Sequence, residues 1–332
     1  MNKLKKIGLT ALAGSLVATS VFAGDMAVTG NASVTFAGQD KASTGNGWSM
    51  SDEITFAGSG ELDNGFTLSV SMQLDNNAVA SAGNTMDNRS LSLDMAEAGK
   101  ITFYGHGADS ALSAVDDVMP RAGGNEAWDT LGAPNATAKF GSIGGHTVNN
   151  MMHYNNSAIV EGLSFNASYA PGTTATTVAG GDAGAEGTTS FAVAYTGVEG
   201  LTLGYAIDEN GALGTAAVDY DTMYIKYAMG PVVVGYQKSE SDGGLTTLAD
   251  DDEFQAYGIS YAVSEDLSIS YEQSKYDDGV QTTDQENTLF GASYSMGSMS
   301  LSISMVSMDN VGGSTDADND TSGYEVGLSF AF

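Results

Sequence analysis

Apolar and polar residues take alternate positions along much of this chain. Residues 66 to 74 read FTLSVSMQL, in which every second residue is apolar and those between are small, hydroxylated or amide-bearing. Successive side chains of a β-strand point to opposite faces, so this pattern predicts a strand with a different environment on each face. The same period of two returns at 201–207, 257–261, 267–271 and 301–305. The chain is therefore predicted to be all-β.

The alternation and the turn residues together predict sixteen strands. They are expected at 26–36, 48–58, 65–75, 89–96, 99–106, 149–155, 162–170, 189–197, 200–208, 218–228, 231–239, 253–262, 267–275, 286–296, 299–309 and 322–332. Long gaps of 9 to 42 residues alternate strictly with short gaps of 2 to 6 residues. Short turns at one end and long loops at the other are typical of outer-membrane barrels. We therefore expect a transmembrane up-and-down antiparallel β-barrel of about sixteen strands.

The lipid environment expected around the strands explains why such a sheet should close into a barrel. Lipid offers no hydrogen-bond partner to a strand edge, so a sheet that crosses a membrane closes on itself. Tyr, Phe, Leu, Val and Met should then face lipid, while Ser, Thr, Asn and Gly face a wet interior that sixteen strands leave open. The alternative from the same pattern is a soluble β protein with buried core tyrosines.

The first 23 residues have the layout of a secretory signal peptide. Lys3, Lys5 and Lys6 precede an apolar stretch from 7 to 22, and small residues at its end suit cleavage before Gly24. A membrane anchor is the alternative for this segment. Beyond Gly24 no run of about 18 apolar residues could cross a membrane as a helix. The expected division is a signal peptide at 1–23 and a barrel at 24–332.

The charge balance excludes several classes of protein. The chain has 41 acidic and 11 basic residues, a net charge of −30, and the part after residue 23 keeps 8 of those bases. A nucleic-acid-binding protein needs a basic face, so no nucleic-acid partner is expected. The absence of cysteine excludes disulfides and thiolate metal sites.

The final strand ends on an aromatic residue. Residues 324–332 read YEVGLSFAF, an alternating strand whose last residue is Phe332. Together with VTGNASVTFAG at 28–38, SGELDNGFTLSVSMQL at 59–74 and KITFYGHGADSALSAVDDVMP at 100–120, this chain resembles the sixteen-stranded outer-membrane porins of alphaproteobacteria.

The resemblance implies a location in the outer membrane of a Gram-negative bacterium, reached by export through the periplasm. It implies that Tyr324, Phe330 and Phe332 form the signal read by the barrel-assembly machinery. It also implies a homotrimer in contact with outer-membrane lipid and lipopolysaccharide, which passes small hydrophilic solutes. No cofactor is required for that function.

In the family that this chain resembles, the third long loop folds into the pore and narrows it. The matching segment is 107–148, with a short helix expected at 108–118. Its charged residues, the candidate constriction, are Asp109, Asp116, Asp117, Arg121, Glu126 and Asp129, and the candidate pore wall is Lys100, His153 and Lys226. The alternative is an external loop with ordinary surface acids.

The sequence departs from the family in its arginines. Porins of this type oppose the acidic loop with an arginine cluster, whereas this chain has Arg only at 89 and 121. The long gaps hold 21 acidic and 3 basic residues. Carboxylates in a narrow aqueous passage attract cations, so we expect a cation-preferring general diffusion porin. A substrate-selective channel and a non-conducting surface barrel (adhesin or scaffold) remain alternatives.

Acidic runs in the long gaps raise the question of metal binding. Asp316, Asp318 and Asp320 resemble the start of a calcium loop, but Thr321 and Gly327 stand where an EF-hand needs Gly and Glu. Loose binding of calcium or magnesium there, or at 250–253 and 277–278, is left open. The three histidines form no recognised catalytic motif, so no enzyme is expected, although a dispersed Ser/His/Asp site is not excluded by sequence.

Overall fold

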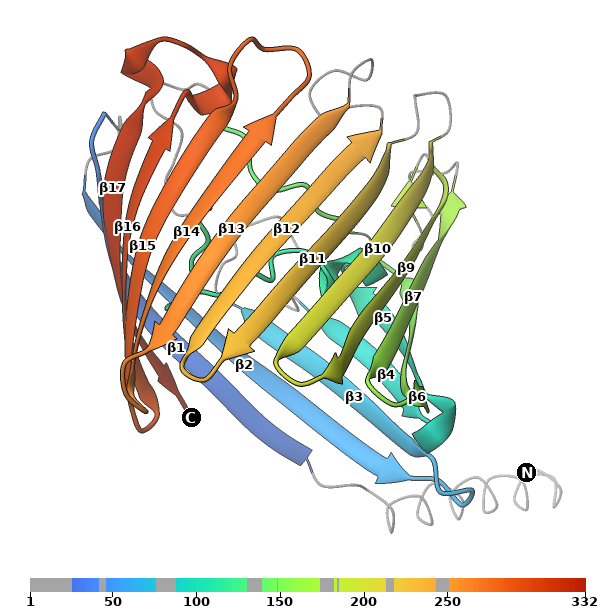
Figure 1. The fold of residues 1–332 in the computed structure, drawn as a ribbon. Helices are drawn as coiled ribbons and strands as arrows, with labels where there is room; N and C mark the ends of the chain where they lie inside the picture. The colour runs from blue at the N-terminus through green and yellow to red at the C-terminus, as the bar shows by residue number, and fades with distance from the viewer. Residues whose placement is uncertain are drawn as a thin grey trace, which may run out of the picture.

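The computed structural model of the chain is a closed β-barrel (Figure 1). It describes residues 26–41, 46–75, 88–129, 139–147, 149–173, 182–183, 185–212, 218–242 and 251–332. The strands are β1 (Met26–Gln39), β2 (Gly47–Glu61), β3 (Thr67–Asp75), β4 (Arg89–Asp94), β5 (Lys100–His106), β6 (Met151–Val160), β7 (Leu163–Thr173), β8 (Asp182–Ala183), β9 (Ala185–Val198), β10 (Leu201–Ala212), β11 (Asp219–Met229), β12 (Val232–Asp242), β13 (Asp252–Ala262), β14 (Leu267–Asp277), β15 (Gln285–Met296), β16 (Met299–Asp309) and β17 (Thr321–Ala331). The expected signal peptide at 1–23 lies outside the described residues.

Sixteen of these strands form the barrel, and all sixteen were predicted. Each barrel strand runs antiparallel to both of its neighbours, with β7 paired directly to β9. The two-residue β8, which the sequence analysis did not predict, runs parallel to the end of β7. The predicted ends of the strands differ from the observed ones by a few residues, as at β13, predicted at 253–262 and observed at Asp252–Ala262. The antiparallel barrel is confirmed.

The first and last strands close the sheet. Val34 of β1 lies opposite Met50 of β2 on one side and Leu328 of β17 on the other. The final residue extends this seam, because Phe332 and Gly30 each donate a backbone hydrogen bond of 2.9 Å to the other's carbonyl. A Cβ at Gly30 would lie 2.8 Å from the Phe332 ring, so the ring needs glycine at this position. A closed sheet leaves no strand edge unpaired.

The two ends of the barrel carry unlike connections, as the gap lengths predicted. Adjacent strands at one end are joined by short turns such as Gly230–Pro231 between β11 and β12. The other end carries the long loops, and we refer to the two as the short-turn end and the long-loop end. In the described part of the chain, no helix has the length and apolarity to cross a membrane. The helical segments there are 3-10 turns, η2 (Ala96–Ala98), η3 (Ala111–Ala114), η5 (Val311–Gly313) and η6 (Ala317–Asn319).

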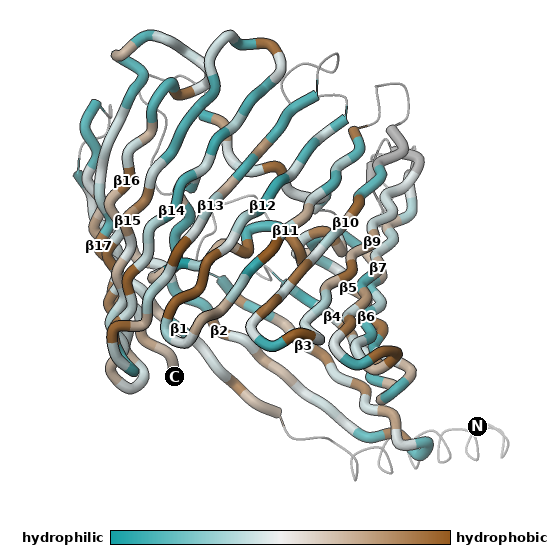
Figure 2. Tube along the Cα trace, in the orientation of Figure 1, coloured by the Kyte–Doolittle hydropathy of each residue, from teal (hydrophilic) through white to brown (hydrophobic). Residues whose placement is uncertain are grey.

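The outer face is apolar toward the short-turn end. On β14, Leu267, Ile269 and Tyr271 point outward, whereas Ser270 and Ser274 point inward. Strands β11 to β14 change from hydrophilic at the long-loop end to hydrophobic toward the short-turn end (Figure 2). An aromatic pair marks the boundary on β12 and β13, where the rings of Tyr236 and Tyr257 lie 4.9 Å apart.

One part of the inner face differs from the expectation. Large apolar side chains were expected to meet lipid, but Phe254, Tyr276, Leu289 and Met308 point inward and are buried. They lie near the long-loop end of β13 to β16, where residues of the segment 107–147 cover them. The expectation of a wholly small and polar interior is therefore wrong for this part of the wall.

Candidate channel constriction

The described residues of the 107–148 segment lie against the inner face of the wall. Backbone N–H groups of this loop donate to inward-facing side chains on five strands: Ala111 to Ser168 on β7 (2.9 Å), Leu112 to Ser190 on β9 (3.0 Å), Val118 to Gln237 on β12 (3.3 Å), Ala122 to Ser270 on β14 (2.8 Å) and Phe140 to Gln285 on β15 (2.9 Å). Residues 130–138 and 148 lie outside the described part. The polar inner residues of the wall therefore serve as acceptors for the loop backbone.

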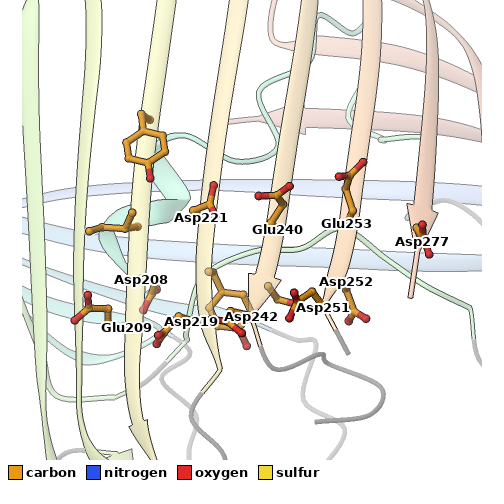
Figure 3. Close-up of a pocket in the computed structure, with 14 residues that line it drawn as sticks. Asp208, Glu209, Asp219, Asp221, Glu240, Asp242, Asp251, Asp252, Glu253 and Asp277 are labelled. Atoms are coloured by element: carbon orange, nitrogen blue, oxygen red, sulfur yellow. The ribbon is translucent and has the colours of Figure 1, made fainter. Parts of the chain in front are cut away.

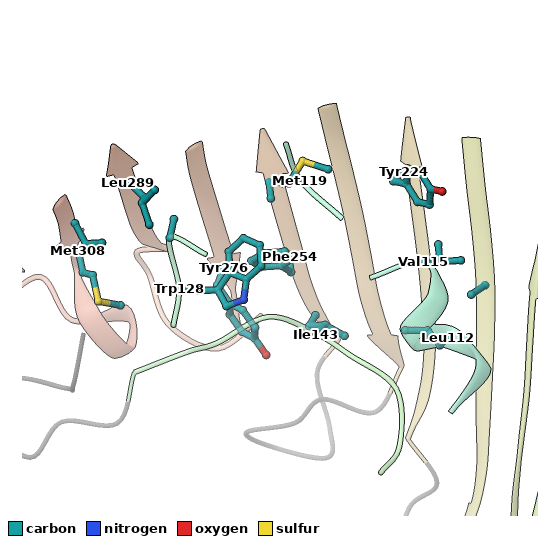
Figure 4. Close-up of a cluster of buried hydrophobic side chains, with 14 of the residues drawn as sticks. Leu112, Val115, Met119, Trp128, Ile143, Tyr224, Phe254, Tyr276, Leu289 and Met308 are labelled. Carbon is teal, nitrogen blue, oxygen red and sulfur yellow. The ribbon is translucent and has the colours of Figure 1, made fainter. Parts of the chain in front are cut away.

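A buried apolar cluster adds to these hydrogen bonds (Figure 4). The loop contributes Leu112, Val115, Met119, Trp128 and Ile143, and the wall contributes Tyr224, Phe254, Tyr276, Leu289 and Met308. Trp128 is fully buried, and its ring meets that of Phe254 edge to face at 4.8 Å. Burial of large aromatic side chains stabilises a fold by several kcal/mol in total. The loop is thus packed against the wall as tightly as the elements of a hydrophobic core pack against each other.

Glycines in the wall allow the loop to approach this closely. A Cβ at Gly258 on β13 would lie 2.8 Å from Cδ of Pro120, and one at Gly291 on β15 would lie 2.5 Å from the carbonyl oxygen of Ala122. Both distances are shorter than van der Waals contact. Any larger residue at these two positions would push the loop away from the wall.

The returning end of the loop is held by a buried carboxylate. Asp208 on β10 has no exposed surface and accepts two hydrogen bonds from His146, one from its backbone N–H at 3.0 Å and one from ring Nδ1 at 3.0 Å. The His146 ring also meets the Tyr220 ring edge to face at 4.8 Å. Sequence analysis did not select Asp208, because nothing local to β10 shows that this aspartate meets the loop.

The six predicted constriction residues fall into two groups. Asp109, Arg121 and Asp129 are exposed, whereas Asp116 and Asp117 are half-buried and Glu126 is buried. Arg121 and Glu126 form an ion pair within the loop. The exposed carboxylates available to a solute are therefore those of Asp109 and Asp129.

The half-buried pair has altered acidity. Burial raises the pKa of Asp116 to about 7, and repulsion from Asp117 and then Asp109 adds to the shift. Burial also raises the pKa of Asp117, followed by repulsion from Asp129. Around neutral pH Asp116 therefore exchanges a proton, and the negative charge of the loop grows as pH rises.

The expected short helix at 108–118 is mostly wrong. The structure has one 3-10 turn, η3, which covers Ala111–Ala114. Asp117 takes a left-handed backbone conformation with a φ of 50°, which a right-handed helix does not tolerate. The N–H groups of Ala111 and Leu112 donate to wall serines, so the loop follows the wall and not a helical axis.

The three predicted wall residues face inward by strand register. Lys100 begins β5 at the short-turn end, opposite Asp94 and Asn155. His153 on β6 has its ring 5.2 Å from that of Tyr104, and its Nε2 lies 3.1 Å from Sδ of Met151. Lys226 on β11 holds its Nζ 5.6 Å from the centre of the Tyr224 ring.

Further inward carboxylates were missed by the sequence analysis. Glu53 on β2 accepts hydrogen bonds from the amides of Asn31 and Gln73. Glu325 on β17 accepts one from Asn125 of the loop at 2.9 Å. The signal was present, because both residues stand at inward positions of an alternating strand. The predicted charged sites came from the long gaps, although the same parity applies to acids within strands.

Carboxylates also gather on the outer side of the wall at the long-loop end. A hollow of about 630 Å³ is lined by ten acidic residues from β10 to β14 and the adjoining residue 251: Asp208, Glu209, Asp219, Asp221, Glu240, Asp242, Asp251, Asp252, Glu253 and Asp277 (Figure 3). Asp208 and Asp252 among them are buried, and the other eight are exposed or half-buried. Lys238 forms ion pairs with Glu240 and Glu253 beside it. The structure thus brings together described members of two acidic runs, 250–253 and 277–278, that lie far apart in sequence.

The other acidic run is arranged as a turn. Asp316 accepts the backbone N–H of Asp318 at 3.0 Å, and Asp320 accepts that of Asn310 at 2.8 Å. Over the described ranges, no group of three or more His, Cys, Asp or Glu side chains is arranged to hold a metal ion. The weak calcium or magnesium site at Asp316, Asp318 and Asp320 stays a prediction.

The candidate assembly residues point outward from the last strand. Tyr324 lies 6.0 Å from the Phe36 ring, and Phe330 and Phe332 are exposed on the apolar face at the β17–β1 seam. This placement fits a lipid-facing strand end. Their role in assembly stays a prediction.

A closed antiparallel barrel of sixteen long strands with an apolar outer face is the architecture of a transmembrane barrel. The chain matches the model of the Gram-negative porin family over residues 8–282, and it belongs to that family. A comparison with curated protein sequences finds no match.

Solved structures share the fold at low sequence identity. The anion-selective porin from Comamonas acidovorans aligns with a TM-score of 0.67 and 15% identity, over 93% of this chain and 100% of that one. OmpF of Salmonella typhi, in complex with daunomycin, aligns with a TM-score of 0.66 and 17% identity, over 93% of this chain and 98% of that one. An OmpT of Vibrio cholerae from which loop L8 is deleted aligns with a TM-score of 0.65 and 14% identity, over 93% of this chain and 100% of that one. At these identities the similarity shows the fold alone.

Proposed function

We propose that this porin is a general diffusion channel of the outer membrane that passes ions and small hydrophilic solutes and prefers cations. Family and fold support the channel itself. The preference for cations depends on one observation, the excess of carboxylates over basic groups on the loop and the inner wall, where Lys139 lies beside Asp129 and donates to the carbonyls of Trp128 and Asp129. An anion-selective porin shares this fold, so the fold does not determine which ion is preferred, and the sign must come from the side chains of this chain.

Carboxylates face the interior from both the loop and the wall. Asp109 and Asp129 are exposed on the loop, and Glu53 faces inward from β2 with amide partners that leave its charge uncompensated. On the described parts of β1 to β5, Lys100 is the base at an inward position, and it lies at the short-turn end. Negative charge between low-dielectric walls raises the local concentration of cations.

The eight acidic residues of the long-loop end that are exposed or half-buried extend the same field outward. They surround a hollow beside the barrel mouth, with Lys238 as the basic neighbour that pairs with two of them. A strongly negative rim draws cations toward the mouth before they enter, an effect that weakens as salt rises.

The test is the reversal potential of refolded protein in a planar bilayer under a gradient of potassium chloride. We expect the sign that corresponds to potassium permeating faster than chloride. Asp129→Asn should lower this preference, because it removes an exposed carboxylate of the loop. Asp316→Asn removes the same charge from the turn between β16 and β17 and should have a smaller effect. A potential of the opposite sign would overturn the proposed cation preference.

Two other functions make different predictions for the same experiment. A non-conducting surface barrel would show no steps of conductance at all. A strictly substrate-selective channel would exclude small sugars of every kind but one, whereas a general channel admits them by size in a liposome-swelling assay.

A dispersed hydrolase site is the remaining alternative, and the geometry does not favour it. Ser110, His146 and Asp208 do come together, but Ser110 is completely buried and its backbone N–H donates to the carbonyl of His146. An enclosed hydroxyl cannot reach a substrate. These three residues hold the end of the loop.

Export through the periplasm, assembly by the barrel-assembly machinery, contact with lipopolysaccharide and a homotrimeric state belong to the same proposal. They are supported by membership in the porin family and by the outward aromatic residues Tyr324, Phe330 and Phe332 of the final strand.

A further inference from the structure

A small hollow opens where the loop leaves the wall, next to β5, β6 and β7. It has a volume of about 230 Å³. Tyr104 on β5, His153 on β6 and Asn166 on β7 line it from the wall, and Asp109, Ser110 and Ser113 are among the residues that line it from the loop. The three wall residues stand at inward positions, since their neighbours Phe103, Met152 and Tyr169 are exposed on the outer face. The hollow therefore belongs to the interior of the barrel.

Two rings and one carboxylate dominate its chemistry. The Tyr104 and His153 rings meet nearly at right angles, with 74° between their planes, and both residues line the hollow. Asp109 is exposed, and Thr147 donates a hydrogen bond of 2.9 Å to its Oδ1. The face of a tyrosine ring attracts a cation, and a carboxylate accepts strong hydrogen bonds from an ammonium group.

The remaining polar groups include both acceptors and a donor, because the Asn166 carbonyl already accepts from the Asn155 amide at 2.6 Å and leaves its own amide as a donor. Ser113 uses its hydroxyl hydrogen on the carbonyl of Ser110 at 2.8 Å, which leaves its oxygen lone pairs as acceptors. The ring Nε2 of His153 lies 3.1 Å from Sδ of Met151. A ligand that donates hydrogen bonds and carries positive charge fits such a surface better than an anion does.

We propose that this hollow, the amine pocket, binds the ammonium group of small organic amines as they pass through the channel. A metal ion fits less well, because over the described ranges no three acidic or imidazole side chains converge to hold one. A neutral solute can form a hydrogen bond with the carboxylate, but it gains no attraction from the negative field of the interior. The proposal rests on the proposed function only in that amines must reach the pocket from solution.

The test measures the binding of benzylamine to the refolded full-length protein in detergent by isothermal titration calorimetry. We expect saturable binding, one amine to each chain. Asp109→Asn should weaken it about tenfold or more, the usual effect of losing a hydrogen bond to a charged group. Tyr104→Leu should weaken it several-fold, because it removes the ring face. Benzyl alcohol, which has the ring without the charge, should not bind measurably.

Two variants serve as controls for the Asp109 result. Asp129→Asn removes another exposed loop carboxylate, and Thr147→Val removes the hydrogen bond to Asp109 but keeps its charge. Both should bind benzylamine within about twofold of the parent protein, the usual scatter for substitutions outside a site. Equal weakening by Asp109→Asn and Asp129→Asn would mean that the general field attracts the amine, and it would overturn the pocket.

Conductance separates the failure of this proposal from the failure of the proposed function. In a planar bilayer carrying potassium chloride, benzylamine should reduce the ion current in a saturable manner, and less so in Asp109→Asn. Normal ion current without benzylamine binding would refute the pocket and leave the channel intact. Benzylamine binding by calorimetry without any ion current would support the pocket and refute the channel.

Discussion

The inner wall of this barrel has two unlike parts. On β7 and on β9 to β17, which we call the covered wall, the loop is fastened by the hydrogen bonds and the apolar cluster described above. On β1 to β5, the open wall, the inward positions carry small polar residues such as Ser69, Ser71 and Ser92 around a hollow of about 280 Å³. Every loop contact described above that fixes the backbone ends on the covered wall.

The difference teaches how a long segment can lie inside a barrel in one fixed arrangement. A loop that lay free in the interior would lose its backbone hydrogen bonds to water and its order to conformational entropy. Fastened to one side, it becomes part of the wall and leaves the inner face of the open wall uncovered. The residues that hold the loop are therefore different from the polar residues that line the open wall.

The largest expected effect comes from the centre of the apolar cluster. Trp128→Ala removes a fully buried ring that meets Phe254 at 4.8 Å. We expect a loss of about 3–5 kcal/mol in the free energy of unfolding, the usual cost of truncating a buried aromatic residue. Denaturant unfolding in detergent measures it, and proteolysis within 107–147 should become faster.

Ser71→Ala on the open wall is the matched control for that variant. Ser71 points into the interior from β3 and touches no part of the apolar cluster. Its replacement should change the free energy of unfolding by about 0.5 kcal/mol or less. If the two variants were equally stable, the distinction between covered and open wall would be wrong.

A smaller effect is expected at one of the glycines that let the loop approach the wall. Gly258→Val places a branched side chain where a Cβ alone would be 2.8 Å from Pro120. Overpacking of this kind costs about 1–3 kcal/mol, and it should displace the loop toward the open wall. Single-channel conductance should therefore fall. Gly58→Val on β2, where a Cβ would meet nothing closer than 3.7 Å, should leave conductance unchanged.

A further effect is the pH dependence of loop attachment. The pKa of Asp116 is about 7 in the folded protein, raised mainly by burial from 3.8. Between these values the folded protein keeps a proton that the unfolded chain has released, so stability is greatest at acidic pH and is lost as pH rises toward 7. Asp116→Asn cannot ionise and should remove this dependence from the unfolding midpoint, whereas Asp129→Asn should retain it.

The strands and the faces of the barrel were readable from local sequence. Alternation fixes which residues share a face, and the unequal gaps assign turns to one end and loops to the other. Lys100, His153 and Lys226 were placed inward by parity alone, and the register agrees. The same parity applied to Glu53 and Glu325 would have found the inward acids as well.

The loop and its attachment were not readable in this way. Leu289 and Met308 stand at inward positions of their strands, where parity alone predicts polar residues, and nothing nearby shows that Trp128, more than 150 residues earlier, covers them. The helix expected at 108–118 fails for a related reason, because the acceptors for its N–H groups are serines on β7 and β9.

The sequence by itself determined a closed cylinder, its strand order, its unlike ends and its negative charge, since each follows from neighbouring residues and from the rule that lipid accepts no hydrogen bonds. Only the tertiary structure decided which side of the interior is covered, which acids remain free to meet a solute and where a ring lies beside a carboxylate. Those outcomes depend on contacts between residues far apart in the chain, such as Asp208 with His146, and they exist only once the sheet has closed.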